Sequence, residues 1–477
     1  MASLLQTPAP VRRAWALALA AAALAAALPF LRGILLGRIL YFRDLAVLFY
    51  PYRQYVVEGL RAGQLRFWDP YVHEGVPLFY PPLAYPLDLL QAVWADRRAI
   101  SSLLVLHVPL GAAAFVLLAR RFGLAPLAAA GGAIAYALGG FLLSTLNLYI
   151  YAQAAAWAPV VILGLRAAGR GRPRAIAAAA LATAVAISTL GIEVALQAVV
   201  VGLVVAFRPR RPAASMGAGA AALLGAGLAA PVVLVMRANM SAGERAHGFA
   251  TDVVLNQSIH PFTLLQVLVA NLYGDLARLP DGWWGSNFFD RGFPYILSLY
   301  LGATVFALAV AGAGTDRRRS MRVLVLALAA LVVALGRYGA LEPVLDVLPD
   351  SWRVFRYPTK AFFTVHLCTA VLAAIGIRKL ARGAGWRLFG AVSLGLGVPL
   401  LLAPALPMVL PRAAAWFVAH FFPPAMGATV RAANFAELVR DAAAGGGLAV
   451  AAAAVAWAVR SGRVAARMGA VLIVAIA

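Results

Sequence analysis

Hydrophobic residues in this chain fall into runs of about twenty, separated by short arginine clusters or by longer segments of mixed character. A run of that length, wound as a helix, crosses the roughly 30 Å hydrocarbon core of a bilayer. Helices are predicted near residues 14–36, 100–119, 124–146, 149–167, 175–190, 192–207, 213–236, 293–313, 321–337, 361–377, 388–410 and 443–459, with another beginning near 468. The pattern predicts an all-α polytopic membrane protein with about 12–13 transmembrane helices.

The apolar stretch from 175 to 207 is too long for one span. As a single helix it would be about 50 Å long, and it would place its two flanking arginine clusters on opposite sides of the membrane. Two short helices with a turn at "STLGIE", Ser188 to Glu193, avoid both problems. A helical hairpin is therefore predicted, with its turn at the outer face.

The basic residues set the predicted topology. Arginine clusters mark cytoplasmic helix ends, and placing them all on one side puts the N-terminus in the cytoplasm. The long segments 37–99, 238–292, 338–360 and 411–442 then form extracytoplasmic loops. Every Asp and Glu except Asp316 falls on that outer side, so any chemistry is expected there.

Composition supports the membrane class and excludes others. The chain is 63% hydrophobic and 12% charged, with a formal net charge of +23. Because the basic residues form short clusters between apolar runs, nucleic-acid binding is not expected. The single cysteine excludes an intrachain disulfide. One transmembrane domain over residues 1–477 is predicted, and the end of the chain inside an apolar run suggests a truncated C-terminus.

The first outer segment concentrates candidate chemistry. Asp44 follows the first helix, and "RFWDPYVHEGVPLFYPPLAYP" adds Trp68, His73, Glu74 and Tyr80. Aromatic rings suit the membrane interface, but they also stack on sugars, while acids accept hydrogen bonds from sugar hydroxyls. Asp44 could equally be a solvated aspartate paired with Arg43. Both interpretations remain open from composition alone.

Two later motifs carry further candidates. Glu193 stands at the hairpin turn, where it either caps the second helix or serves a site. In "SWRVFRYPTKAFF", Arg356 and Lys360 lie just outside a helix start and could bind one anion at the membrane surface. The same cations could simply anchor lipid headgroups.

No metal site is predicted. His73 and Glu74 are adjacent and cannot chelate from one helical face. A hard divalent cation held by Asp44 and other loop carboxylates stays open, and no cofactor is expected.

Taken in order, "FWDPYVHEGVPLFYPPLAYPLDLL", "GGFLLSTLNLYIYAQAAAWAPVVILGL", "STLGIEVAL", "HPFTLLQVLVANLYG" and "FRYPTKAFF" resemble the bacterial YfhO-like membrane proteins of the GT-C glycosyltransferase superfamily. The resemblance implies an enzyme that moves a sugar from a polyprenyl-phosphate carrier to a cell-envelope acceptor on the outer face. Relatives often carry a His where this chain has "LNLYIY", and a Gly-His-Pro-Glu-like turn where it has Gly191-Ile192-Glu193.

The resemblance also suggests roles for the candidate residues. The essential acid of the first outer loop corresponds to Asp44, with Glu193 as the second acidic residue. The expected substrate-binding residues are Arg43, Trp68, His73, Glu74, Tyr80, Arg356, Tyr357 and Lys360. Transfer by a single displacement would invert the anomeric centre. Two other classes stay open: a lipid or solute transporter or flippase, and a non-catalytic envelope-assembly scaffold.

Overall fold

The computed structural model describes residues 8–477 except 73, 79–83, 95, 208–211, 242–245, 315–316 and 350–352. Within this part of the chain, eight helices are long and apolar enough to cross a membrane. The pair Ser215–Leu228 and Ala230–Ser241, bent by 60°, forms a further candidate span, and four shorter apolar helices accompany them. These helices correspond one to one with the hydrophobic runs of the sequence.

The long and short helices of the bundle, in chain order, are α2 (Ala9–Leu35), α5 (Arg97–Arg121), α6 (Pro126–Leu138), α8 (Ile150–Ala168), α9 (Pro173–Ser188), α10 (Ile192–Ala206), α11 (Pro212–Leu228), α12 (Ala230–Ser241), α14 (Ala303–Ala313), α15 (Arg317–Leu335), α17 (Phe362–Ala381), α18 (Trp386–Leu401), α21 (Ala428–Arg460) and α22 (Ala466–Ile476). Short helices α7 (Gly140–Ser144) and η3 (Thr145–Leu148) continue α6, and η8 (Gly336–Tyr338) continues α15. Helices η11 (Ala403–Ala405) and α19 (Leu406–Val409) follow α18.

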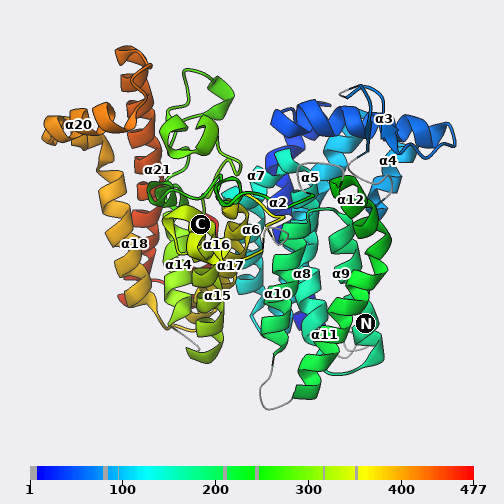
Figure 1. The fold of residues 1–477 in the computed structure, drawn as a ribbon. Coiled ribbons are helices and arrows are strands. Elements are labelled where there is room, and N and C mark those ends of the chain that lie inside the picture. Colours follow the sequence, from blue (N-terminus) through cyan, green and yellow to red (C-terminus); the bar gives the residue numbers. More distant parts are fainter. Residues whose placement is uncertain are drawn as a thin grey trace.

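The helices form two groups that lie side by side (Figure 1). One contains α2, α5 and α8 to α12, and the other contains α14, α15, α17, α18, α21 and α22. Helices α6 and α17 pack together and join the groups. Within the second group, α14 and α17 approach so closely that a Cβ on Gly312 would meet the Leu372 carbonyl, and a Cβ on Gly376 the Leu308 carbonyl. Such close approach is typical of small residues in membrane helices.

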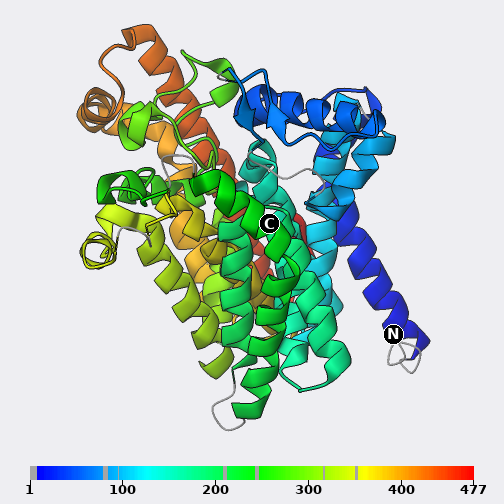
Figure 2. The same cartoon turned by 45° about the vertical axis from the view of Figure 1, so that its right-hand side comes forward.

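Helix α2 lies at the outside of the first group (Figure 2). It packs on α5, and its buried residues are the stripe Ala18, Ala22 and Ala26. The i, i+4 spacing places these small side chains on one helical face. The other residues of the helix are exposed or only partly buried, as expected for a span at the edge of the bundle.

The two ends of the bundle differ. One end, called here the arginine-rich end, carries Arg166, Arg378 and Arg460 at helix termini joined by short turns. The other, called the loop-rich end, carries the long irregular segments and the amphipathic helices α3 (Tyr50–Arg61) and α20 (Pro411–Phe421), which lie across the helix ends (Figure 1).

The loop-rich end also contains several short elements. They are the π-helix η1 (Leu45–Phe49), strands β1 (Trp68–Asp69) and β2 (Val76–Pro77), which pair antiparallel, and helices η2 (Pro86–Asp88), α4 (Leu89–Val93), α13 (Thr251–Val254), η4 (Pro261–Val267), η5 (Leu276–Arg278), η6 (Gly285–Phe288), η7 (Asp290–Gly292), α16 (Glu342–Asp346) and η10 (Pro358–Ala361).

Two predicted boundaries need correction. The helix expected at 293–313 begins at Ala303, because residues 293–302 are irregular and their backbone N–H groups donate to side-chain oxygens. The Gln257 amide oxygen accepts from the backbone N–H of Tyr295, and that of Gln266 from Leu299. Non-helical backbone near a membrane requires such internal partners. The helix expected at 443–459 begins earlier, at Ala428, inside the segment predicted as an outer loop.

Candidate functional site

A cavity of about 360 Å³ lies at the loop-rich end, between segments that are far apart in the sequence. Its lining combines charged side chains with aromatic and aliphatic ones. The lining residues are Arg43, Asp44, Leu48, Phe49, Leu148, Ile150, Tyr151, Leu190, Glu193, Met236, Tyr295, Arg356, Tyr357 and Lys360. This volume falls within the range of small-molecule sites.

The hairpin of α9 and α10 places Glu193 on the cavity wall. A Cβ on Gly191 would lie 2.6 Å from the Ile150 carbonyl oxygen, so only glycine lets the turn pack this closely against the start of α8. Glu193 then stands in the first turn of α10, where the Tyr151 hydroxyl donates to its Oε2 at 3.1 Å. Glu193 therefore lies in the first turn of α10 and also lines the cavity, so the two interpretations of this residue do not exclude each other.

Lys360 is buried and pairs with Glu193 across 167 residues of sequence. Its Nζ lies 2.5 Å from Glu193 Oε1. The rings of Tyr151, Tyr295 and Tyr357 surround the ammonium, with centroids at 5.3, 5.3 and 5.4 Å. Aromatic faces attract a cation, so this cage holds the Lys360 charge at one point of the cavity.

Gln197 fixes the relative position of the helices that carry this pair. Its Nε2 donates to the backbone carbonyls of Glu193 and Lys360, at 3.1 Å each. Its Oε1 accepts from the backbone N–H and the hydroxyl of Thr364, at 3.2 and 2.8 Å. One side chain thus joins the start of α10 to the start of α17.

Asp44 and Arg43 reach the cavity from the first outer segment. Arg43 does not pair with Asp44: its Nη1 donates to the Pro294 carbonyl at 2.6 Å, and its guanidinium lies 4.8 Å from the Phe293 ring centroid. Among the residues that the structure describes, none bonds to the Asp44 carboxylate. The π-helix η1 begins directly after Asp44, and π-helical turns are frequent at functional sites.

Arg356 contributes the second cation of the predicted anion clamp. Its guanidinium lies 4.7 Å from the Tyr357 ring centroid and 5.5 Å from that of Phe249. Within the described part of the chain it makes no hydrogen bond or ion pair with protein. Its donors are therefore available to an anion in the cavity.

Unusual backbone conformations surround the cavity. Three lining residues other than glycine have positive φ: Arg43 at 45°, Leu190 at 67° and Tyr357 at 71°. Tyr149, between two lining residues, has φ of 21°. Each such conformation costs on the order of 1–3 kcal/mol, and they cluster at functional sites.

An apolar groove of about 300 Å³ adjoins the cavity. The two spaces share Glu193, Arg356, Tyr357 and Lys360 as lining residues. The remaining groove walls are mostly aliphatic, including Leu196 of α10, Val333 of α15, and Leu341 and Leu345 at α16. A polar chamber and an apolar groove therefore meet at the Arg356 and Lys360 cations.

The structure does not bring all of the predicted substrate contacts to the cavity. Trp68 and Glu74 belong to the small hairpin of β1 and β2, and neither lines the cavity. His73 and Tyr80 lie outside the described residues. No group of three His, Cys, Asp or Glu side chains in the described ranges is placed to hold a metal ion.

Sequence reasoning missed two kinds of residue. Tyr151 and Tyr295, which face Lys360, were not singled out as site residues, although Tyr151 lies in "LNLYIY", where relatives often carry a His. It also missed the buried pair of Arg53 and Asp88, 2.6 Å apart, next to the cavity. Nothing in the local sequence marks which of the many acids is buried.

The Asp88 carboxylate of the Arg53–Asp88 pair is enclosed by further protein donors. Asp88 Oδ1 accepts from the Tyr149 hydroxyl at 3.0 Å, from Gln153 Nε2 at 3.2 Å and from Gln91 Nε2 at 3.4 Å. Burial by itself lowers the pKa of the Arg53 guanidinium, but the Asp88 carboxylate outweighs it and the pKa stands above its ordinary value. The network ties the first outer segment to the start of α8.

These helices define an all-α polytopic membrane protein, with a polar cavity at its loop-rich end. Among solved structures, the chain resembles ArnT from Cupriavidus metallidurans, crystallised with undecaprenyl phosphate, with a TM-score of 0.50 and 16% sequence identity. The match covers 97% of this chain and 76% of that one. No protein-family model and no curated protein sequence matches the chain. The likeness is one of fold.

Proposed function

We propose that this protein is a YfhO-like GT-C glycosyltransferase that moves a sugar from a polyprenyl-phosphate carrier to a cell-envelope acceptor at the outer face of a bacterial inner membrane. The observation that carries the proposal is the junction of a polar cavity and an apolar groove at Arg356 and Lys360. A lipid-linked sugar has the same order of parts: a polar sugar, a phosphate and a hydrocarbon chain. The fold shared with ArnT, which was crystallised with undecaprenyl phosphate, supports this donor class.

The donor binds across that junction. Its phosphate lies between Arg356 and Lys360, its sugar occupies the cavity beside Asp44, and its prenyl chain follows the groove past Leu196 and Val333. Matching polarity favours this orientation of the donor, because the groove offers aliphatic walls and the cavity offers hydrogen-bonding groups. The ring of Tyr295 stands where it can stack on the sugar.

The reaction is a single displacement at the anomeric carbon. Asp44 accepts the proton of the acceptor hydroxyl as its oxygen attacks that carbon. The bond from the anomeric carbon to the phosphate oxygen breaks, and its electron pair goes to the phosphate, where Arg356 and Lys360 meet the charge. Glu193 holds Lys360 in place and serves as the second acid beside the sugar. Attack opposite to the leaving group inverts the anomeric centre.

The proposed orientation of the protein in the membrane follows from the arginines. The arginine-rich end faces the cytoplasm, which leaves the N-terminus inside and the cavity outside.

The shared cavity favours an enzyme over a non-catalytic scaffold. Asp44, Glu193 and Arg356 line one cavity, and a scaffold would not require them to do so. Sugar contacts by Trp68, His73, Glu74 and Tyr80 remain predictions; of the two that the structure describes, neither Trp68 nor Glu74 lines this cavity.

The decisive experiment replaces Asp44 with Asn, which keeps the shape of the side chain and removes the base. Lipid-linked sugars and envelope glycans are compared by mass spectrometry in cells that lack the protein and cells that carry the wild type, Asp44→Asn or Asp252→Asn. Asp252 is an exposed acid of the same face, outside the cavity. We expect the wild type and Asp252→Asn to restore one glycan modification, and Asp44→Asn to lower it by about 10²–10⁴-fold.

Restoration of the modification by Asp44→Asn at the wild-type level would disprove the role of Asp44. If instead no lipid-linked sugar or glycan differs between cells with and without the protein, transferase activity itself is refuted. Equal amounts of the variants in the membrane fraction exclude failed insertion as the cause.

A further inference from the structure

A second cavity, of about 230 Å³, lies at the opposite, arginine-rich end of the bundle. It opens between the two helix groups, and its walls come from the ends of α5, α8, α10, α15 and α17. Most of the lining is aliphatic, with Val201 on one side and Leu367 and Val371 on the other. This cavity therefore starts at the ends of α10 and α17 that are far from Glu193 and Lys360, and its lining reaches back along α17 to Leu367.

Three arginines from three different helices line this cavity. They are Arg166 near the end of α8, Arg322 near the start of α15 and Arg378 near the end of α17. The Arg166 guanidinium lies 4.2 Å from the Phe122 ring centroid, which holds it against the cavity wall. No acidic side chain stands among the described residues that line the cavity.

The cavity has the length of one bilayer leaflet. Leu367 and Arg378 are eleven residues apart on α17, which corresponds to about 16 Å along the helix. Half of the hydrocarbon core is about 15 Å. The arginines stand only at one end of this length, so the charge lies at headgroup level and the aliphatic wall runs toward the middle of the membrane.

We propose that this cavity binds one anionic glycerophospholipid of the leaflet at the arginine-rich end. Its phosphate lies among Arg166, Arg322 and Arg378, and one acyl chain fills the space between Val201 and Val371. Basic pockets between membrane helices on the cytoplasmic side are suited to such headgroups. Isolated arginines at helix ends anchor headgroups at the surface, but convergence of three helices on an internal apolar space builds a site.

The lipid would join the two helix groups where they do not touch directly. Helices α10 and α17 are clamped at the loop-rich end by Gln197 and separate around the cavity at the other end. A bound lipid bridges Arg166 of the first group to Arg322 and Arg378 of the second. This inference does not depend on the proposed transferase activity.

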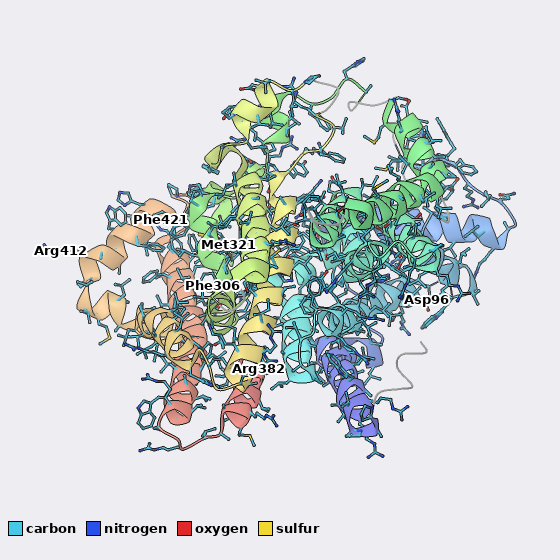
Figure 3. The ribbon with its side chains drawn as sticks, turned by 90° about the horizontal axis from the view of Figure 1, so that it is seen from below. Asp96, Phe306, Met321, Arg382, Arg412 and Phe421 are labelled. Carbon is cyan, nitrogen blue, oxygen red and sulfur yellow. The ribbon has the colours of Figure 1, made fainter. Side chains whose placement is uncertain are left out.

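The test measures lipid binding to the delipidated 477-residue protein in detergent by native mass spectrometry. The probes are dioleoyl-phosphatidylglycerol, dioleoyl-phosphatidylcholine and undecaprenyl phosphate. The variants are Arg322→Gln with Arg378→Gln, and a matched control, Arg382→Gln with Arg387→Gln, exposed arginines at the same end outside the cavity. Arg382 is labelled in Figure 3, as is Met321, the neighbour of Arg322 on α15.

We expect wild-type protein to retain phosphatidylglycerol at least tenfold more tightly than phosphatidylcholine. Loss of the two lining arginines should weaken phosphatidylglycerol binding by roughly thirtyfold, whereas the control pair should leave it within a factor of about two. Val371→Trp, which fills the cavity without changing charge, should also abolish tight retention. The wild-type comparison needs no variant, so it tests the site even if a variant does not fold.

Three results would overturn the proposal. Equal retention of the two glycerophospholipids would remove the anionic requirement. An equal effect of both arginine pairs, or no effect of Val371→Trp, would show surface attraction without a site. Tighter retention of undecaprenyl phosphate than of phosphatidylglycerol would assign the cavity to the carrier lipid.

Discussion

Two buried ion pairs in the described part of the loop-rich end, Arg53–Asp88 and Lys360–Glu193, are alike in length but differ in what surrounds their carboxylates. Their N···O distances are 2.6 and 2.5 Å, and both cations are 8% exposed. The Asp88 carboxylate is 4% exposed and Glu193 18%. Asp88 is enclosed by protein donors, whereas Glu193 faces a cavity.

This difference separates a structural pair from a candidate functional one. A buried carboxylate enclosed by protein donors has little capacity left for a ligand, and removing it strands the charge of its partner. A pair on a cavity wall can exchange water for a ligand, and water can replace a lost partner. The degree to which protein encloses the carboxylate, and not the strength of the ion pair, therefore indicates whether the pair is structural or functional.

The largest effect is expected for Asp88→Ala, which strands Arg53 in a protein interior. We expect the free energy of unfolding to fall by about 3–5 kcal/mol, and the yield of folded protein to fall with it. The measurement is thermal unfolding in detergent, with Asp252→Ala as the exposed control. A loss below about 1 kcal/mol would contradict the structural role assigned to the pair.

Glu193→Gln should behave in the opposite way. The amide keeps the shape and one acceptor oxygen, and the neighbouring cavity can supply water to Lys360, so we expect little change in unfolding temperature. Sugar transfer should fall by about 10²-fold, because the neutral amide no longer holds the Lys360 ammonium by charge at the phosphate position. The check is transfer per folded molecule in the complemented cells. A variant that unfolds but transfers normally when folded would reverse the comparison.

The smallest and most discriminating test uses two tyrosines two residues apart. Tyr149→Phe removes a donor from Asp88 and should lower the free energy of unfolding by about 1.5–3 kcal/mol, with transfer by the folded protein unchanged. Tyr151→Phe removes a donor from Glu193 and should leave stability within about 1 kcal/mol while lowering transfer several-fold. If both variants change the same property, enclosure does not distinguish the two pairs.

Much of the fold could be predicted from the sequence. The predicted apolar runs coincide with the observed helices, including the hairpin of α9 and α10, because span length depends on local hydrophobicity and the thickness of the bilayer. The exceptions are informative. Residues 293–302 are as apolar as a span, yet they stay irregular because Gln257 and Gln266, remote in sequence, accept their backbone hydrogen bonds.

Part of the site was visible in the same way. Asp44, Glu193, Arg356 and Lys360 could be singled out because acids, and cations away from the arginine-rich end, are few in so apolar a chain, and all four line the cavity. Sequence could not show that Arg43 turns away from Asp44 to the Pro294 carbonyl, or that Trp68 and Glu74 lie outside the cavity. Those outcomes depend on how the first outer segment packs on residues some 250 positions later.

The sequence by itself determined the class of protein, the positions of the membrane helices and the end of the bundle where polar residues gather. These are local properties, set by runs of about twenty residues and by the arginines that flank them. Only the tertiary structure decided which polar residues meet. Glu193 and Lys360 are 167 residues apart, and their pairing depends on the Gly191 turn, the Gln197 clamp and the tyrosine cage acting together. Contacts of that kind arise from packing between distant segments, which no local pattern encodes.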